Sequence, residues 1–300
     1  GREIAIKTFK VDPIKGRQMF EDEIKVAGYL DHPGIPPIHD VGIDENGKYY
    51  FVMKYVEGET LASLIDRLDA GDPEAHREWP ISRRVDVILE LLNALEYTHH
   101  HGVVHRDIKP ENILLGKFGE VFLTDWGIAR KIGGQEEGNH PIGTPAFMSP
   151  EQLRGENNTL DGRSDLYSLG LLFYEFLTLH HPWRNIKDIK KILELQKTFA
   201  FSNLTAASHK YQSLPAVELL YYCERLLEED REKRIPNAEQ AWKQLQKIQA
   251  GHVPVQCYIT LTKRMIRESA NIMDHSPHLF FGGVLVGLGF FILGVLSVLM

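Results

Sequence analysis

One segment of eight residues constrains this chain more than any other: His105-Arg106-Asp107-Ile108-Lys109-Pro110-Glu111-Asn112. It places a carboxylate, an ammonium group and an amide at Asp107, Lys109 and Asn112. Phosphoryl transfer from Mg-ATP uses these groups, because its catalysis rests on positioning and on neutralising charge on phosphate oxygens. We expect Asp107 to meet the incoming hydroxyl, Lys109 to lie against the transferred phosphate, and Asn112 to offer a neutral oxygen to Mg²⁺.

A second motif follows downstream, where an apolar run leads into Thr124-Asp125-Trp126-Gly127. It resembles the Asp-Phe-Gly motif of protein kinases, with Trp126 in place of Phe, and Asp125 would then bridge the metal to the phosphates. Trp126 has two interpretations. A core substitution is favoured, because an aromatic ring replaces another and buried area is kept. The alternative is a device that tunes the active and inactive positions of the motif.

Further signatures flank these two in the order that kinases show. Upstream, Ile4-Ala5-Ile6-Lys7 resembles the third-strand V-A-I-K motif, and Glu23 lies in a helical stretch as the expected partner of Lys7. Downstream, residues 143–151 resemble the P+1 loop and the A-P-E motif. Several motifs in the right order and spacing make coincidence negligible.

Two more residues complete the pattern by resemblance. Asp165 is the second residue of Ser-Asp-Leu-Tyr-Ser-Leu-Gly at residues 164–170, which resembles the start of the helix whose buried Asp holds the catalytic loop. Arg234 lies where kinases have the ion-pair partner of Glu151.

The chain thus resembles the eukaryotic-like (Hanks-type) serine/threonine protein kinases of bacteria, the PknB/PknD-like group, over about residues 1–249. This implies an α+β, bilobal protein kinase fold, with a β-rich small lobe over 1–55 and a helical large lobe over 56–249. It also implies ATP and Mg²⁺ as cofactors, Mn²⁺ as an alternative ion, and Ser/Thr hydroxyls of proteins as substrates. Lys109 and the Gly-Thr-Pro of the P+1 loop favour serine/threonine over tyrosine specificity.

The resemblance assigns the nucleotide contacts as well. Met53 is the expected gatekeeper, Val56 would offer backbone groups to adenine, and Leu114 would line the ATP site. Lys54 departs from the Glu common at its position, which is tolerable because hinge recognition uses the main chain. Thr144 is expected to contact Asp107 and Lys109.

The activation segment is unusual. Arg106 before Asp107 normally indicates control by phosphorylation, since this arginine pairs with a loop phosphate. Residues 128–143 nevertheless contain no Ser, Thr or Tyr. We hypothesise that Glu136 or Glu137 supplies the anion. The alternative, in which both are solvated and control lies elsewhere, stays open.

The periodicity of apolar residues and the positions of Gly and Pro predict the remaining secondary structure. Helices are predicted over 18–30, 85–100, 164–179 and 217–227, and a strand over 49–56. Residues 66–80, polar and containing Gly and Pro, are predicted to be an inserted surface loop. His99, His100 and His101 are interpreted as a solvated helix end instead of a metal site, and His105 as a packing residue instead of a base.

Composition excludes other classes. A net charge of -7 argues against a nucleic-acid binder. Cys223 and Cys257 have no metal-site spacing, so a reduced, cytosolic environment is the default.

Both ends of the chain carry expectations. Only six residues precede Lys7, too few for the Gly-rich ATP lid, so we expect a fragment that binds ATP poorly by itself. Residues 250–278 are interpreted as a juxtamembrane connector. The uncharged run 279–300 is predicted to be a single transmembrane helix, with the kinase cytoplasmic because Lys263, Arg264 and Arg267 precede it. Gly283 and Gly287 leave a homodimer open.

Three functions remain open from the sequence. The leading one is an active, membrane-anchored and autophosphorylating Ser/Thr kinase. A pseudokinase or scaffold is the alternative, and retention of Lys7, Glu23, Asp107, Asn112 and Asp125 argues against it because packing needs none of them. A small-molecule kinase is disfavoured by the peptide-type P+1 loop.

Overall fold

The computed structural model describes residues 3–8, 20–21, 23–133, 140–203, 205, 207–252 and 262. Contacts divide the chain into two units, Gly1–Gln249 and Ala250–Met300. The predicted membrane helix and nearly all of the predicted connector lie outside the described residues. Within the described part of the chain, no helix combines the length and apolarity needed to cross a bilayer.

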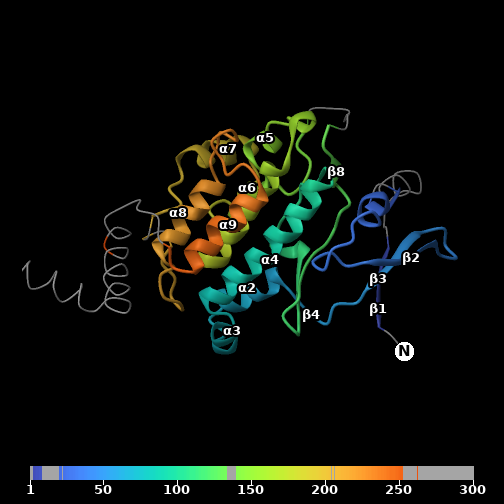
Figure 1. Cartoon of the computed structure of the whole chain (residues 1–300), viewed down its shortest axis with the longest axis horizontal. Coiled ribbons are helices and arrows are strands. Elements are labelled where there is room, and N and C mark those ends of the chain that lie inside the picture. Colours follow the sequence, from blue (N-terminus) through green and yellow to red (C-terminus); the bar gives the residue numbers. More distant parts are fainter. Residues whose placement is uncertain are drawn as a thin grey trace, which may run out of the picture. The chain divides into compact units, whose positions relative to one another are not determined.

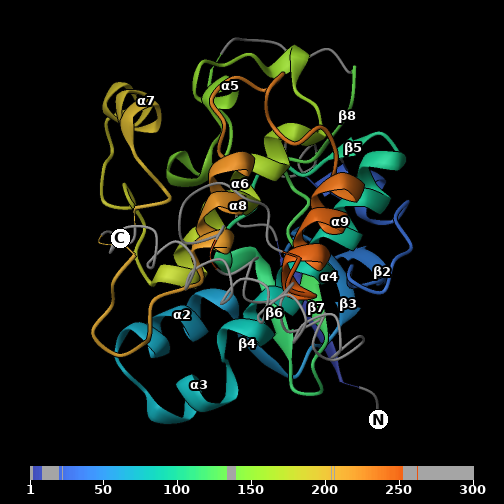
Figure 2. The same ribbon diagram turned by 60° about the vertical axis from the view of Figure 1, so that its left-hand side comes forward.

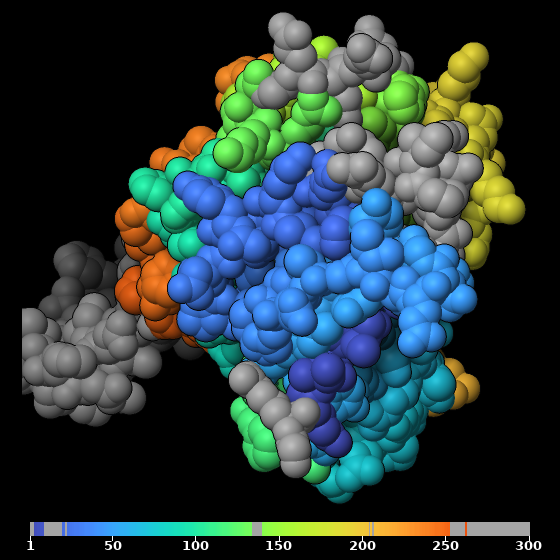
Figure 3. Space-filling view, turned by 90° about the vertical axis from the view of Figure 1, so that its right-hand side faces the viewer, coloured from blue at the N-terminus to red at the C-terminus, as the bar shows by residue number. Residues whose placement is uncertain are grey.

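The small lobe is an antiparallel sheet of three strands: β1 (Ile4–Thr8), β3 (Tyr49–Lys54) and β2 (Ile38–Ile43), in the order β1-β3-β2. Lys7 pairs with Phe51 across β1 and β3. Because side chains alternate along a strand, Lys7 lies on the opposite face from Ile4 and Ile6, which are 47% and 59% exposed. Figure 3 looks onto this lobe, whose blue segments cover the middle of the view.

The large lobe is built around α6 (Gly162–Thr178), in which every residue from Ser164 to Thr178 is buried. Around it lie α4 (Ile81–His100), α8 (Val217–Leu226) and α9 (Ala238–Gln249) (Figure 1). The buried residues of α4 recur at helical spacing, for example Val85, Ile88, Leu92 and Leu95. The three predicted large-lobe helices are therefore confirmed, with small shifts at their ends.

Short elements frame the segments that carry the motifs. Strands β4 (Gly58–Thr60), β6 (Ile113–Gly116) and β7 (Val121–Leu123) form one sheet, and β5 (Val103–Val104) pairs with β8 (Arg130–Lys131). The 3-10 helices span Pro110–Asn112, Pro145–Phe147 and Asn157–Thr159. Helices α5 (Pro150–Leu153) and α7 (Ile189–Thr198) lie at the opposite end of this lobe from α2 (Leu61–Asp69) and α3 (Pro73–Glu78) (Figure 2). The segment with Asp107 thus follows β5, and the segment with Asp125 follows β7.

The predicted surface loop over residues 66–80 is wrong. The chain forms α2 (Leu61–Asp69) and α3 (Pro73–Glu78), and Leu68, Ala75 and Trp79 are buried. The Gly and Pro residues that suggested a loop belong to the turn between the helices. Asp72 caps α3 through Glu74 and Ala75, with proline at the first helical position, where its missing N–H costs nothing.

Candidate active site

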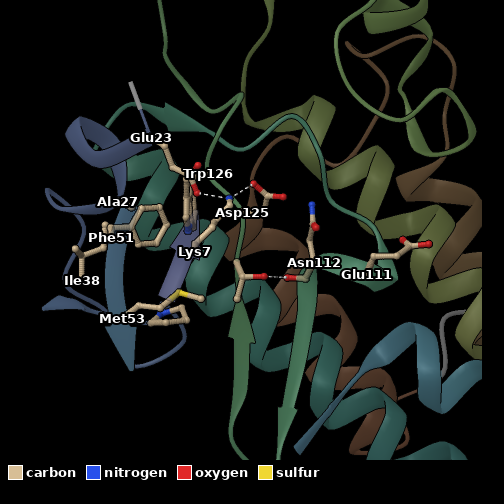
Figure 4. A pocket seen from close by; sticks show the side chains of 12 residues that line it. Lys7, Glu23, Ala27, Ile38, Phe51, Met53, Glu111, Asn112, Asp125 and Trp126 are labelled. Carbon is tan, nitrogen blue, oxygen red and sulfur yellow. Dashed lines mark hydrogen bonds and ion pairs between the residues drawn. The ribbon is translucent and has the colours of Figure 1, made fainter. Parts of the chain in front are cut away.

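A cavity of about 200 Å³ lies between the sheet of the small lobe and the motif segments of the large lobe. The predicted nucleotide- and metal-binding residues Lys7, Glu23, Met53, Asn112 and Asp125 line it. Figure 4 shows Lys7 between Glu23 and Asp125, with Met53 farther along the cavity. The wall is completed by Ala27, Pro36, Ile38, Phe51, Glu111, Thr124 and Trp126. Val56 and Leu114 are both described, and neither is among the lining residues.

Lys7 joins the two lobes through ion pairs. Its Nζ lies 2.7 Å from Glu23 Oε1 and 2.8 Å from Asp125 Oδ1. Burial opposes the charge on Lys7, but the two carboxylates outweigh it and raise the pKa of Lys7. Burial raises the pKa of Glu23 in spite of Lys7. Burial also acts against the charge on Asp125, yet the hydrogen bond from Lys7 holds the pKa of Asp125 below its ordinary value.

The motif that carries Asp125 is held in an uncommon backbone conformation. Asp125 has φ 64°, in the left-handed region that non-glycine residues rarely adopt. Gly127 passes close to the ion pair, and an added Cβ there would lie 3.3 Å from Glu23 Oε2 and 3.5 Å from Asp125 Oδ1. Glycine suits this position because a side chain would press on the Glu23 carboxylate and touch that of Asp125.

The side chain of Trp126 packs in the main hydrophobic core. It is 3% exposed, and its ring meets the ring of His105 edge-on at 4.6 Å between centroids. This packing is the one expected of a core substitution. The indole N–H, however, is buried with no hydrogen-bond partner among the residues that the structure describes, a costly arrangement that a phenylalanine would not have.

The catalytic-loop candidates converge on the carboxylate of Asp107. Lys109 Nζ donates to Asp107 Oδ2 at 2.6 Å and to Thr144 Oγ1 at 2.8 Å. Thr144 donates to Asp107 Oδ1 through its hydroxyl at 2.8 Å and its backbone N–H at 3.1 Å. Asn112 Nδ2 donates to the Asp107 carbonyl oxygen at 2.8 Å and to Oδ2 at 3.1 Å. The amide oxygen of Asn112 is therefore the atom that this side chain can offer to a cation.

The carboxylate of Asp165 holds the backbone of the catalytic loop in place. The backbone N–H groups of His105 and Arg106 each donate to its carboxylate at 2.8 Å, and Asp165 is 0% exposed. These contacts stabilise Arg106 at φ 69°, another left-handed conformation. Burial disfavours the charge, but the hydrogen bond from His99 and the neighbouring donors hold the pKa of Asp165 below its ordinary value.

The histidines divide into different roles. His99 Nε2 lies 2.8 Å from Asp165 Oδ2, so the prediction of a solvated helix end is wrong for His99, because the fold brings a buried acceptor to it. His105 is 0% exposed, and burial lowers its pKa. Its Nε2 lies 3.0 Å from the Thr124 carbonyl oxygen, which only accepts, so Nε2 carries the proton. The packing role predicted for His105 agrees with this geometry.

Arg106 and Glu151 anchor the activation segment at two points. Arg106 Nε donates to the Ile128 carbonyl oxygen at 2.6 Å. Glu136 and Glu137, its hypothesised partners, lie outside the described residues. Glu151 forms a buried ion pair with Arg234 at 2.8 Å and accepts from Ser164 Oγ at 2.8 Å. Burial opposes the charge on Glu151, but Arg234 outweighs it and lowers the pKa of Glu151.

Comparison with known proteins agrees with this geometry. Residues 1–245 match the protein kinase domain family. The chain belongs to the protein kinase family. The predicted bilobal kinase fold is therefore confirmed for the described kinase domain.

Three similar proteins are named as serine/threonine-protein kinases. A "probable serine/threonine-protein kinase" of Streptomyces coelicolor is 39% identical over 193 residues, covering 61% of this chain and 27% of that protein. PknB of Mycolicibacterium smegmatis is 38% identical over 196 residues, covering 61% and 29%. PknD of Protochlamydia amoebophila is 30% identical over 307 positions, covering 91% and 30%. The resemblance to Hanks-type bacterial kinases is confirmed, and the chain spans under a third of each relative's length.

Sequence reasoning missed two supports of the kinase site. His99 reaches Asp165, and Gln152 Nε2 donates to the Arg106 carbonyl oxygen at 2.9 Å. Ser149 and Gln152 have the spacing of a capping box, which the structure contains, so a helix start was detectable there. Nothing in the local sequence indicates either long-range contact.

Proposed function

We propose that this kinase domain transfers the γ-phosphoryl group of Mg-ATP to Ser or Thr hydroxyls of proteins. The observation that carries the proposal is the convergence of Lys109, Thr144 and Asn112 on Asp107, in the loop next to the Lys7–Asp125 ion pair. A scaffold has no packing need for polar groups so arranged. This supports an enzyme over a pseudokinase.

Asp107 is the proposed base. Its carboxylate is held on both oxygens by donors, which fixes its orientation toward an arriving hydroxyl. Lys109 lies within 2.6 Å of Asp107 and is suited to neutralise charge on the transferred phosphate. Thr144 ties the substrate loop to the same carboxylate.

The donor set fits Mg²⁺, with Mn²⁺ as the alternative ion. Asp125 contributes a carboxylate that is 46% exposed, and Asn112 contributes an amide oxygen, both beside the same cavity. Oxygen ligands of this kind suit a hard divalent cation. When bound, the ion would supply positive charge that neutralises the phosphate oxygens.

Lys7 is proposed to orient the ATP phosphates, with Glu23 holding it in place at 2.7 Å. Met53 lines the same cavity and is proposed to border adenine. Val56, through its backbone groups, and Leu114 remain proposed nucleotide contacts by resemblance alone, since neither lines this cavity. Two observations support the proposed specificity for Ser/Thr. The relatives are named serine/threonine-protein kinases, and Lys109 contacts Thr144 at 2.8 Å.

We further propose that residues 279–300 anchor the protein in the cell membrane as a single span, with the kinase domain cytoplasmic. The support is the uncharged sequence and the preceding basic residues. Autophosphorylation and a homodimer through Gly283 and Gly287 belong to the same proposal.

Residues 128–143 lack hydroxyl side chains, so we propose that the activation loop needs no phosphate. A stoichiometric, activity-raising phosphate on Thr144 would contradict this.

The direct test compares Asp107→Asn with a matched control in the full-length protein. Asp31→Asn makes the same chemical change at an exposed position. With Mg-ATP labelled at the γ position, we expect label incorporation in the wild type and in Asp31→Asn, and its loss in Asp107→Asn. Nucleotide binding without transfer in all three proteins would refute the enzyme and favour the pseudokinase.

A further inference from the structure

Another cavity, of about 430 Å³, lies in the large lobe and shares no lining residue with the cavity beside Lys7. Its walls come from β4 and β6, from the turn that follows β6, and from the junction of α3 and α4. Figure 2 shows α3, β4 and β6 together in the lower part of the lobe. Gly58 and Gly116 lie opposite each other across the two strands, so no side chain fills the space at this pair. We call this hollow the β4–α4 cavity.

The junction of α3 and α4 forms one wall through Trp79 and Arg83. Trp79 follows the last residue of α3 and is 7% exposed. The guanidinium of Arg83 lies 4.0 Å from the centroid of the Trp79 ring, and its Nη1 donates to the Glu78 carbonyl oxygen at 3.0 Å. Arg83 is thus held by a ring and a backbone group, and within the described residues it forms no ion pair with a carboxylate.

The wall carries more acidic than basic groups: the carboxylates of Glu57, Glu59 and Glu78 against Arg83 and Lys117. Glu59 is already paired with Arg67 at 2.8 Å. Glu57 pairs with Lys117 at 3.0 Å, but these side chains are 59% and 61% exposed, so water screens the pair and it separates at little cost. Glu78 is exposed and has no ion-pair partner in the part of the chain that the structure describes. A cationic ligand can therefore reach two carboxylates, those of Glu57 and Glu78.

The turn after β6 adds an apolar group beside these charges. Phe118 follows Lys117 and is 83% exposed, more than any other large hydrophobic side chain among the described residues. The turn is fixed, because the Phe118 N–H donates to Glu120 Oε2 at 3.1 Å and Gly119 adopts φ 93°. Covering this ring with a partner would be favourable, since apolar surface would leave water.

We propose that the β4–α4 cavity is a docking site for the protein substrate, separate from the site of phosphoryl transfer. The occupant is an extended segment in which basic residues flank an apolar one. Its cationic groups pair with Glu57 and Glu78, and its apolar side chain packs on Phe118. Charge complementarity selects a basic segment, and the spread of these groups over three elements suits a peptide better than a small cation.

The inference rests on the proposed function, because docking matters only where an acceptor is phosphorylated. A substrate held at the β4–α4 cavity keeps its acceptor near Asp107 at a raised effective concentration. Docking should therefore lower KM for the protein substrate. It should leave KM for ATP unchanged, since the two cavities share no lining residue.

The first test is direct binding to the full-length protein. The probes are fluorescent peptides with a central leucine flanked on both sides by Arg, Gln or Glu, and without Ser, Thr or Tyr. Fluorescence polarisation measures their affinity at low and high salt. We expect the Arg peptide to bind most tightly and the Glu peptide least. Binding of the Arg peptide should weaken with salt, because salt screens exposed charges.

Two variants remove the proposed contacts. The double variant Glu57→Gln with Glu78→Gln removes both charges, and Phe118→Ala removes the ring. The matched control is Glu45→Gln with Glu239→Gln, which makes the same charge change at exposed positions outside both cavities. Because all five side chains are exposed, the melting temperatures should stay near that of the wild type.

The double variant should bind the Arg peptide about 3- to 10-fold more weakly, the effect of losing two exposed ion pairs. Phe118→Ala should weaken binding about 5- to 30-fold through lost apolar burial. The control should match the wild type. In kinetics, joining the Arg segment to a Ser-containing acceptor peptide should lower KM in the wild type and the control alone, with kcat and KM for ATP unchanged.

Three results overturn the proposal. One is equal binding of the Arg, Gln and Glu peptides by the wild type. Another is wild-type affinity for the Arg peptide in both cavity variants, which would place the peptide elsewhere. The third is a concentration-dependent dimer that covers Phe118 and excludes the peptide, which would assign the cavity to a second copy of the chain. Failure of the proposed function is distinct, because the Arg peptide would still bind but no acceptor would be phosphorylated.

Discussion

Replacing Asp165 by Asn tests the support of the catalytic loop. The wild-type carboxylate accepts backbone N–H groups from His105 and Arg106 at 2.8 Å each, and a third contact comes from His99. An asparagine has one oxygen, so one of the two buried backbone donors loses its acceptor. The isosteric side chain leaves the packing volume unchanged.

The expected loss follows from these contacts. An unsatisfied buried N–H costs about 1–3 kcal/mol, and hydrogen bonds to a charged group are stronger than those to an amide. Together they suggest a loss of roughly 2–4 kcal/mol in the free energy of unfolding, because Asp165 is fully buried. For a domain of this size the melting temperature should fall by about 4–16 °C.

Activity should fall as well, since Arg106 at φ 69° and the neighbouring Asp107 lose their support. We expect kcat to decrease about 10- to 100-fold, the effect of a small misplacement of a catalytic group. Because the pKa of Asp165 is depressed, its stabilisation is present above the unfolded pKa of about 4. The difference in melting temperature should therefore persist from pH 8 to 5 and shrink only at lower pH.

Calorimetry and steady-state kinetics across this pH range provide the assay. Asp188→Asn is the control, because Asp188 caps α7 through the Lys190 N–H and asparagine caps equally well. Equal melting temperatures for the Asp165 and Asp188 variants would refute the reasoning.

Three shorter predictions follow. Burial raises the pKa of Glu175 to about 7, despite Arg184, so its protonated form stabilises the fold at low pH and this contribution is lost as pH rises to 7. The melting temperature of wild type should therefore fall relative to Glu175→Gln between pH 5 and 8, and parallel curves would contradict this. Arg234→Met should lower the free energy of unfolding by about 3–5 kcal/mol, because it leaves Glu151 charged and buried. Measured by denaturant unfolding, this loss should exceed that of the double variant that also carries Glu151→Leu. Equal losses in the two variants would argue against the reasoning. Trp126→Phe should destabilise less than Trp183→Phe in the same assay, since only the Trp183 N–H has a partner among the described residues; the reverse order would disprove the account.

Local patterns predicted much of this domain. The buried positions of α4 repeat at helical spacing, and β1 alternates between exposed and half-buried residues. These signals lie within a few residues of one another, so the chain alone reveals them. The turn at Asp72 shows the limit, because Gly, Asp and Pro mark a helix junction as readily as a loop.

The sequence by itself determined which groups are available for the proposed chemistry: the acid at Asp107, the amide at Asn112 and the lysine at Lys7 belong to motifs that can be recognised in the chain. Tertiary structure alone decided what holds them, such as His99 on Asp165 and Trp183 on the loop after Thr144. Reactive groups need particular residue types at fixed spacing, which a sequence records directly. Supporting contacts need only a donor and an acceptor brought together in space, and many residue types at many positions satisfy that requirement.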